Sequence, residues 1–388
     1  MITVIGEFLG TSGYSNHTRG LANALNKITD VKLVTNLIPG WEGLVNDKEL
    51  EMIKRETDYE TNLIITNPLH WKCHLNAKRN FVYLIWEGDK IPQWMMLECL
   101  NPKIEKIIVP STHTYNAVIN TATNDYKKDA AADLKIGDKL IVIPHGYDPE
   151  DFYSQQPEVL ACQGGGEYTR SPKDNSVVSE IGVDEQYPPA DTFTFLANKG
   201  LRNLEDRGGI QYLIEAYLSE FTESEKVELI LKINPAYGVP NLLNMFPNLK
   251  KNGIPKVTFI HDNYSKKQLN ELYNKCDVFV SPTRAESFNL PCLEAMACGK
   301  PVITTNYGGQ TDFCTNETGW LVDFDMTEVK HEIEYEGISW ATPKMDDLKK
   351  QLRLAFETDL SLAKTKNAYQ SSQNLTWENT ANQILKLV

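Results

Sequence analysis

Short runs of apolar residues recur along the chain and leave room for a helix between most neighbours. In the first half they occupy 2–5, 32–35, 63–66, 81–85, 106–109 and 140–143, and in the second half 192–197, 227–233, 257–260, 278–280, 301–305 and 319–322. Runs of this length, rich in β-branched and aromatic residues and separated by stretches of helical length, are typical of buried parallel strands with crossover connections. The pattern predicts an α/β protein with doubly wound parallel sheets in both halves.

Apolar residues at helical spacing predict helices at 17–27, 210–221, 265–276, 345–357 and 375–388, with Ser265 and Thr376 as N-caps. The periodic pattern stops between residues 154 and 191, where glycine and proline clusters alternate with mixed charge. Such a stretch is typical of a linker or an irregular insertion. We therefore expect one domain at 1–153 and a second at 192–371.

Composition narrows the class of protein. A chain of 388 residues with 41% hydrophobic and 23% charged residues fits two globular domains, and a net charge of −13 argues against a broad nucleic-acid surface. The seven cysteines are scattered and form no Cys-x-x-Cys pair, so we expect reduced core thiols. The N-terminus shows neither a signal peptide nor a membrane-spanning segment, and we expect a cytoplasmic protein.

The stretch from Val278 to Thr304 carries the strongest chemical signal. Pro291 suits the first position of a helix and Gly299 suits its stop, which predicts a helix from about Pro291 to Cys298 with Glu294 in its first turn. A helix start offers backbone N–H groups to an anion. A phosphate there would have Glu286 on one side and Glu294 on the other, each able to accept hydrogen bonds from hydroxyl groups. The alternative is an ordinary strand, loop and helix, because glutamate is favoured near a helix start in any case.

A basic loop follows the first strand of the second half. The segment NKGLRNLEDRGG contains Lys199, Arg202 and Arg207 together with three glycines. Positive charge and flexible backbone at the carboxyl end of a strand are what a diphosphate requires. Because these cations and a helix start can hold the diphosphate, we expect neither a metal nor another cofactor.

Three further residues lie at strand ends of the first half, where ligands bind in doubly wound sheets. Gly13, in GTSGYSNHTRG, either lets the backbone approach a ligand or is only a turn glycine. Glu87, in WEGDKIPQW, either faces the second domain or is a solvated loop residue. His145, in IPHGYD, either reaches the space between the domains or only caps the turn, and we favour the cap.

The spacing from Glu286 to Glu294 resembles the Glu-x7-Glu motif of the retaining, nucleotide-sugar-dependent glycosyltransferases of family 4, which have the GT-B fold. The resemblance extends over nearly the whole chain, in the order glycine loop, WEGDKIP, IPHGYD, basic loop, Glu-x7-Glu and a terminal helix that starts with Trp-Glu. The chain departs from the family at three positions. Ser287 and Asn289 stand where glycines are usual, and Lys199 stands where arginine is common.

The resemblance implies a role for each of these groups. Glu286 would contact hydroxyls of the donor sugar and Glu294 those of the ribose, while Lys199 and Arg207 would grip the donor phosphates, with Arg202 as a substitute for either. Gly13 and the backbone from Ser287 through Phe288 and Asn289 to Leu290 would lie near the donor. The first domain would be the acceptor side, the second the donor side, and the terminal helix, about 372–388, would cross back to the first domain.

The implied reaction moves a sugar from a nucleotide diphosphate to an acceptor hydroxyl, with retention at the anomeric carbon and without a metal. The acceptor would be a carbohydrate, a lipid-linked molecule or another hydroxyl compound. We do not expect nucleic acid as a partner. Peripheral contact with a membrane is compatible with the sequence. Two alternatives are a sugar-nucleotide epimerase of the same fold and a non-catalytic sugar-nucleotide binder. The sequence does not identify the sugar, the nucleotide or the acceptor.

Overall fold

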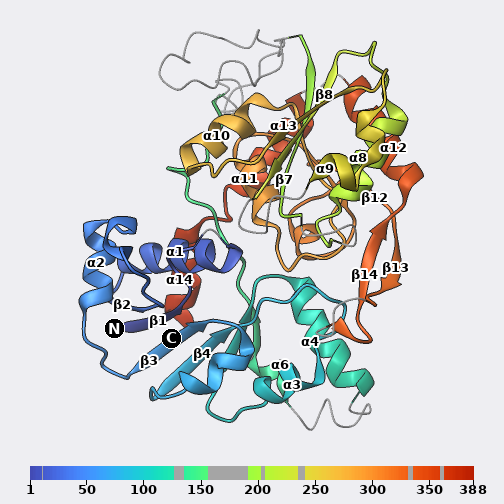
Figure 1. Cartoon of the computed structure of the whole chain (residues 1–388). Helices are drawn as coiled ribbons and strands as arrows, with labels where there is room; N and C mark the ends of the chain where they lie inside the picture. Colours follow the sequence, from blue (N-terminus) through green and yellow to red (C-terminus); the bar gives the residue numbers. More distant parts are fainter. Residues whose placement is uncertain are drawn as a thin grey trace.

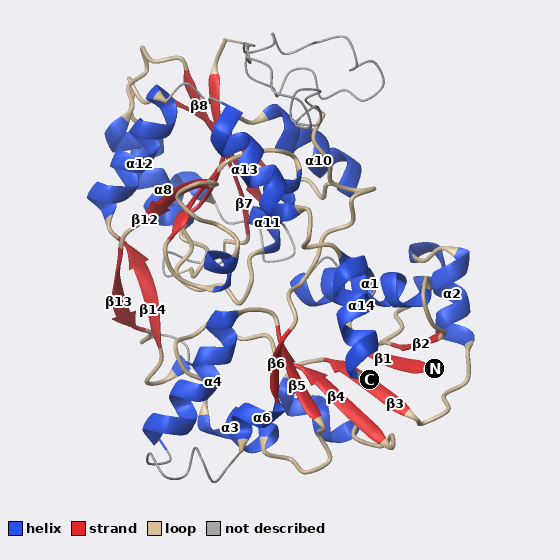
Figure 2. Ribbon diagram, turned by 180° about the vertical axis from the view of Figure 1, so that it is seen from behind, coloured by secondary structure: helices blue, strands red, loops and turns tan. Residues whose placement is uncertain are grey.

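The protein consists of two α/β domains, one above the other in Figures 1 and 2. The computed structural model describes residues 1–10, 12–125, 135–155, 191–201, 206–234, 241–330, 335–358 and 362–388. Within these ranges, no helix is both long and apolar enough to cross a lipid bilayer. Most of the expected linker, residues 156–190, lies outside the described residues.

The first domain contains a parallel six-stranded sheet in the order β2-β1-β3-β4-β5-β6. Its strands are β1 (Ile2–Gly6), β2 (Val31–Val34), β3 (Thr61–Ile65), β4 (Arg79–Tyr83), β5 (Lys106–Val109) and β6 (Leu140–Val142). The helices are α1 (Gly13–Asn26), α2 (Asp47–Lys54), α3 (Gln93–Cys99), α4 (Thr112–Asp125) and α6 (Ile136–Lys139).

The second domain repeats this architecture with the order β12-β11-β10-β7-β8-β9, again all parallel. Its strands are β7 (Phe193–Lys199), β8 (Val227–Ile233), β9 (Lys256–Ile260), β10 (Val278–Ser281), β11 (Val302–Thr305) and β12 (Gly319–Val322). Its helices are α8 (Ile210–Glu220), α9 (Leu242–Met245), α10 (Lys266–Lys275), α11 (Leu290–Ala297), α12 (Met345–Glu357) and α13 (Leu362–Ser372).

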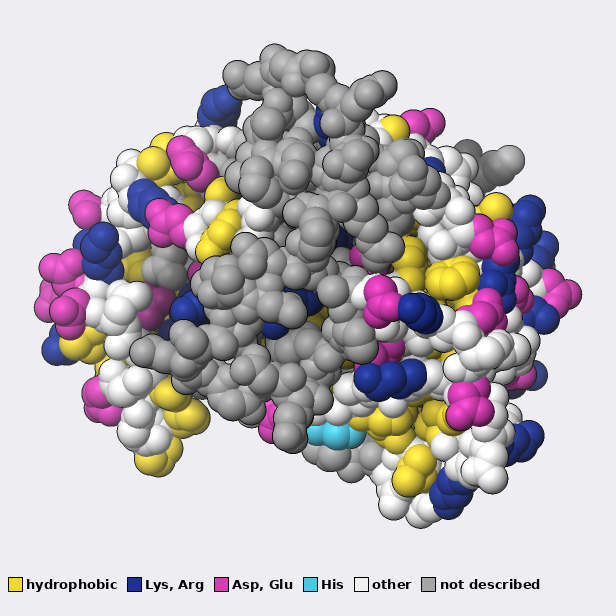
Figure 3. All heavy atoms as spheres, turned by 90° about the horizontal axis from the view of Figure 1, so that it is seen from above, with side chains coloured by type: hydrophobic (Ala, Val, Ile, Leu, Met, Phe, Trp, Pro, Cys, Tyr) yellow, Lys and Arg dark blue, Asp and Glu magenta, His cyan; other side chains and the backbone are white. Residues whose placement is uncertain are grey.

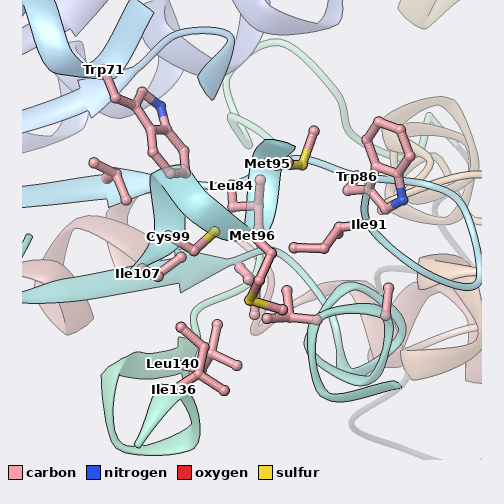
Figure 4. Close-up of a cluster of buried hydrophobic side chains, with 14 of the residues drawn as sticks. Trp71, Leu84, Trp86, Ile91, Met95, Met96, Cys99, Ile107, Ile136 and Leu140 are labelled. Atoms are coloured by element: carbon pink, nitrogen blue, oxygen red, sulfur yellow. The ribbon is translucent and has the colours of Figure 1, made fainter. Parts of the chain in front are cut away.

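The predicted doubly wound architecture is confirmed, and each apolar run named above forms a strand of one of the two sheets. Strands such as β1, β8 and β10 are buried on both faces, which is why they read as continuous apolar runs. Helices from both sides close the cores. Figure 4 shows part of the first domain's core, where Leu84, Met95 and Met96 lie between Trp71 and Trp86 in one buried cluster.

The terminal helix α14 (Trp377–Leu387) belongs to the first domain in space. It lies beside α1 in both ribbon views, and both chain ends are in this domain (Figures 1 and 2). Trp377, Ala381 and Ile384 join the core beneath β1 and α1. Thr376 caps the helix, as predicted, by accepting from the Asn379 N–H. The chain thus crosses between the domains twice, and the two crossings pair through a bridge between Tyr147 and Thr376.

A two-stranded antiparallel hairpin, β13 (Phe324–Glu328) and β14 (Ser339–Pro343), was not predicted. It leaves the second domain and reaches down beside α4 of the first (Figures 1 and 2). Residues at its far end, Tyr335, Ile338 and Trp340, are buried within the first domain's hydrophobic core. The hairpin is therefore a third connection between the domains.

The expectation of buried thiols holds with one correction. Five of the six described cysteines are buried, but Cys73 is exposed in the 3-10 turn Pro68–Cys73; Cys162 lies outside the described residues. None of the described cysteines is in a disulfide. On the face shown in Figure 3, Lys and Arg side chains alternate with Asp and Glu, without a broad patch of one sign among the described residues.

Candidate functional site

The loop between β10 and α11 lies where the two domains meet. Helix α11 begins at Leu290, one residue before the predicted start, so Glu294 is its fifth residue and lies beyond the first turn. Gly299 has a left-handed backbone with φ 74°, as expected for the helix stop. Asn289, the residue before the helix, is also left-handed, with φ 75°. Asparagine tolerates this conformation better than other non-glycine residues, which accounts for its place at a position where the family uses glycine.

Lys199 is the centre of the donor-side cluster. It ends β7, and its side chain is almost fully buried, at 6% exposure. Its ammonium lies 2.7 Å from Glu286 Oε1 and donates to Asn289 Oδ1 at 2.9 Å. The Asn289 amide in turn donates to Ser281 Oγ at 3.0 Å. The structure thus brings two of the predicted residues, Lys199 and Glu286, into one ion pair at the start of α11.

The electrostatics of Glu286 follow from this pairing. Burial alone would raise the pKa of its carboxyl, but the Lys199 and Arg207 cations outweigh burial and hold that pKa below its ordinary value. Glu286 is therefore a carboxylate at neutral pH. A carboxylate with a lowered pKa is a poor proton acceptor but a good acceptor of hydrogen bonds from hydroxyl groups.

Arg207 pairs with the other domain. Its Nη1 lies 2.7 Å from Glu87 Oε1, and Glu87 lies in the loop after β4. The loop that carries Arg207 docks tightly on the residues after β10: the Arg207 carbonyl accepts from the Arg284 N–H at 2.7 Å. Gly209 makes this approach possible, because it has φ 76° and any β-carbon would lie 1.9 Å from the Pro282 carbonyl oxygen.

Glu87 therefore faces the second domain. The same Oε1 accepts from the Tyr335 hydroxyl at 2.6 Å, and the Tyr335 ring stacks on Trp86 with centroids 5.0 Å apart. Three elements thus meet at one carboxylate: the loop after β4, the loop after β7 and the β13–β14 hairpin. Of the alternatives considered for Glu87, the geometry agrees with the interdomain position and not with a solvated loop residue.

Gly13 is the first residue of α1, and open space surrounds the position where its β-carbon would be. Burial raises the pKa of the next residue, Tyr14. The negative charge of Glu87 raises this pKa further, whereas the positive charge of Arg207 lowers it. The start of α1 therefore lies within electrostatic range of the Glu87–Arg207 pair. Gly13 thus lies at an uncrowded position next to the candidate site.

Glu294 lies at the other end of the cluster, within a second network. Its Oε2 accepts from the Tyr273 hydroxyl at 2.9 Å, and the Tyr273 oxygen accepts from the Asn198 amide at 3.0 Å. Burial raises the pKa of Glu294 to about 7, although the Tyr273 hydrogen bond acts in the opposite direction. The two carboxylates of the motif therefore differ in charge state near neutral pH.

The residues between the two carboxylates contact the first domain. The Ser287 carbonyl accepts from Ser111 Oγ at 2.6 Å, and Phe288 lies 5.0 Å from the His145 ring. Leu290 packs against the hydrophobic cores of both domains. The loop that would bind the donor phosphates is thus held between the domains.

His145 reaches the domain boundary but does not cap its turn. Neither of its ring nitrogens has a hydrogen-bond partner, and the same is true of His17, whose ring lies 4.1 Å away. Burial lowers the pKa of His145 to about 3. The pKa of His17 is lowered well below its ordinary value, mainly by burial and in addition by the interaction with His145. Both rings are therefore neutral and act as packing groups beneath Trp377.

Of the predicted site residues, Arg202 lies outside the described residues. Sequence reasoning missed Tyr14, Asn198, Tyr273 and Tyr335. Tyr273 lies in the predicted helix 265–276, whose apolar spacing gives no sign of a role for the Tyr273 hydroxyl, and no pattern relates Tyr335 to Glu87. Among the described residues, no group of three or more histidine, cysteine or acidic side chains is arranged to hold a metal ion.

With this geometry described, the chain can be compared with known proteins. Residues 201–335 match the family model described as glycosyl transferases group 1. The matched segment includes Arg207, Glu286 and Glu294. D-inositol 3-phosphate glycosyltransferase of Rhodococcus opacus (strain B4) is 33% identical over 132 residues, which are 34% of this chain and 26% of that protein. The serotype-specific mannosyltransferase WbdA of Escherichia coli is 27% identical over 148 residues, 34% of this chain and 16% of that protein.

The chain spans about a quarter or less of the length of these curated relatives. Solved structures match over the whole chain. A glycosyltransferase from Rickettsia africae ESF-5 covers it with a TM-score of 0.66 and 16% identity, with 97% of that chain aligned. Anabaena Alr3699/HepE, in complex with UDP-glucose, also has a TM-score of 0.66 and 16% identity, with 98% aligned. At this identity the likeness shows the fold: the protein has the two-domain, Rossmann-like GT-B architecture.

Proposed function

We propose that the protein is a glycosyltransferase that moves a sugar from a nucleoside diphosphate to an acceptor hydroxyl. The observation that carries the proposal is the buried Lys199–Glu286 pair at the start of α11, within a domain that matches group 1 glycosyl transferases. A cation beside a helix start suits a phosphate, and a carboxylate beside it suits sugar hydroxyls. The nucleotide sugar is bound between the domains.

The diphosphate leaving group interacts with Lys199, Arg207 and the backbone at the start of α11. Both cations are paired with carboxylates in the structure, with Glu286 and Glu87. Donor binding therefore exchanges these pairs for phosphate contacts, and the freed carboxylates accept hydrogen bonds from hydroxyls. Fixed positive charge stabilises the developing charge of the leaving diphosphate, so the reaction requires no metal ion.

The transfer proceeds with retention on the front face of the sugar, without a protein nucleophile. The leaving phosphate takes the acceptor proton. Glu286 orients the donor sugar and is not the base, which agrees with its lowered pKa. On the other side of the phosphates, Glu294 binds the ribose hydroxyls. The backbone from Ser287 to Leu290 lies between these two carboxylates.

The acceptor binds on the first-domain side, near Gly13 and Glu87. Glu87 is the carboxylate of that domain closest to the donor cluster, because it contacts Arg207 directly. Its chemistry suits an acceptor rich in hydroxyl groups, such as a carbohydrate or a polyol on a lipid carrier.

The experiment that tests this function is a donor panel. The full-length protein is incubated with UDP-, GDP-, ADP-, CDP- and TDP-sugars, and released nucleoside diphosphate is measured with and without EDTA. We expect slow release from one nucleotide class, unchanged by EDTA and abolished in a Lys199→Ala/Arg207→Ala double variant. Conversion of the donor into an epimer would identify the protein as an epimerase instead. Binding without release or transfer in the presence of simple polyols would identify a non-catalytic binder.

A further inference from the structure

Tyr273 and Asn198 form a fixed chain of hydrogen bonds behind Glu294. The Asn198 amide group donates to the Tyr273 oxygen, so the single Tyr273 hydrogen is directed at Glu294 Oε2. Tyr273 is fully buried. This burial, and in addition the negative charge of Glu294, holds the pKa of the Tyr273 hydroxyl well above its ordinary value. Its hydroxyl therefore remains a donor at every pH at which the protein is folded.

The chain has a defined direction along the carboxyl edge of the second sheet. Asn198 lies in β7, one residue before Lys199, so alternation along the strand sends the two side chains to opposite faces. Lys199 contacts Glu286 and Asn198 contacts Tyr273 of α10. One strand end thus supports both carboxylates of the motif, Glu286 through a cation and Glu294 through a neutral donor.

The geometry points to Tyr273 as a positioning residue that fixes one oxygen of Glu294 and favours its charged form, so that the other oxygen is aimed at the ribose of a bound nucleotide. This inference rests on the proposed function. Among the described residues, the Glu294 carboxylate accepts a hydrogen bond only at Oε2, which leaves Oε1 available for a ribose hydroxyl. Asn198 acts on Glu294 only through Tyr273.

The surroundings of Glu294 leave Tyr273 as the main local support for its charge. From α10, Lys266 favours the carboxylate, while Asp151, after β6, opposes it. These two charges form an ion pair with each other, so their effects on Glu294 partly cancel. Cys298, at the end of the same helix, has a thiol pKa raised mainly by burial and stays neutral.

A pH profile distinguishes this role from a purely structural one. With the pKa of Glu294 at about 7, a ribose site that needs the carboxylate loses affinity as pH falls below that value. Removing the Tyr273 hydroxyl removes a hydrogen bond to the charged form, so the midpoint should move upward by about one pH unit. A structural defect would weaken binding by the same factor at every pH.

The test uses Tyr273→Phe, which keeps the ring contacts with Phe152 and Phe279. Affinities for UDP, GDP, ADP, CDP and TDP are measured by calorimetry from pH 5.5 to 9 on the full chain. The Glu294→Gln variant lacks the titrating carboxyl, so the pH dependence of its nucleotide affinity measures the titration of the nucleotide phosphate and can be subtracted. Tyr217→Phe is the matched control, because it removes another buried hydroxyl, which bonds to the Lys256 carbonyl on the far side of the domain.

We expect wild type and Tyr217→Phe to share one midpoint near pH 7 and Tyr273→Phe to have a higher one. The upward shift of about one pH unit corresponds to about a 5-fold loss of affinity at pH 7, which narrows at pH 9. An unchanged midpoint in Tyr273→Phe overturns the inference and leaves the proposed function standing. Failure of wild type to bind any of the five nucleotides overturns the proposed function itself. Carbon-13 titration of the Glu294 carboxyl, assigned with Glu294→Gln, measures the same shift without a nucleotide, and an unshifted titration also contradicts the inference.

Discussion

Asn289 occupies a left-handed position that glycine would take without strain, so its side chain must account for the choice of residue. The amide oxygen accepts from Lys199 and the amide nitrogen donates to Ser281. The chain thus departs from the pattern of the family that it resembles at two residues that contact each other, a lysine in place of arginine and an asparagine in place of glycine. The contact between them explains both departures together.

Asn289→Gly should therefore lower turnover without unfolding the protein. Glycine keeps the backbone conformation, but the Lys199 ammonium loses one of its two side-chain acceptors, and losing a hydrogen bond to a charged group corresponds to about a 10- to 100-fold loss in rate. Steady-state release of nucleoside diphosphate measures the effect. Ser281→Ala, which removes only the other amide contact, is the control and should lose less. Equal losses in the two variants would contradict a specific role for the Lys199 contact.

The two neutral histidines predict a pH-dependent stability. His145 has a folded pKa of about 3, below its value in the unfolded chain, so the unfolded state binds more protons as pH falls below about 6.5. Stability is complete above that pH and decreases toward pH 3, by about 1.4 kcal/mol per pH unit for each such group.

Urea unfolding at pH 7.5 and 5.5 tests this effect. His145→Phe, which preserves the aromatic packing, should lose about 1.4 kcal/mol less than wild type between the two pH values. If the His145→Phe variant shows the wild-type pH dependence, the ring is not held neutral in the folded protein.

At the scale of elements, the sequence predicts the sheets and the helix of the motif well because their signals are local. Buried parallel strands are continuous apolar runs, and Pro291 and Gly299 mark the ends of α11 to within one residue. The β13–β14 hairpin was missed because its strands are short and β13 is largely exposed and polar. Its partners are also distant in sequence, so no local pattern indicates the contact between Tyr335 and Glu87.

Because the hairpin contacts Glu87 on the acceptor side, a change in the hairpin should weaken acceptor binding without weakening donor binding. Tyr335→Phe keeps the ring stacked on Trp86 but removes the hydrogen bond that orients Glu87. We expect a higher KM for the acceptor, by about 10-fold for one lost bond to a charged group, with nucleoside diphosphate affinity unchanged. Kinetics with varied acceptor and calorimetry with the diphosphate measure the two quantities. An equal loss of diphosphate affinity would show that the hairpin acts on the donor site instead.

At the scale of the whole molecule, the domains are joined by the two chain crossings, by the hairpin and by direct contacts such as that of Ser111 with Ser287. Order along the chain predicts which segments form each domain, but it does not predict which side chains meet between them. Those contacts depend on the angle between two rigid bodies. That is why Glu87 and Arg207 were each identified as candidates, while their ion pair and the contact of Glu87 with Tyr335 were found only in the structure.

The terminal helix should be essential to the first domain's stability. Trp377 fills a space against Gly20 and the two histidines, at 7% exposure. Trp377→Ala should reduce the free energy of unfolding by about 3–5 kcal/mol, the usual cost of emptying a large aromatic site. Urea denaturation measures it, with Leu385→Ala on the exposed side of the same helix as control. A loss below about 1 kcal/mol for Trp377→Ala would contradict the core role of α14.

The most direct measurement compares Glu286→Ala and Glu286→Gln with Glu294→Ala, using turnover of the nucleotide sugar and calorimetric affinity for the bare nucleoside diphosphate. If Glu286 holds the donor sugar, Glu286→Ala should lose turnover by about 100-fold while its diphosphate affinity falls little, because a misplaced sugar loses its attack geometry. Glu286→Gln keeps one acceptor oxygen and should lose less, whereas Glu294→Ala should lose diphosphate affinity most. Normal turnover in Glu286→Ala, or a loss of diphosphate affinity as steep as that of Glu294→Ala, would contradict the assignment of this carboxylate to the sugar.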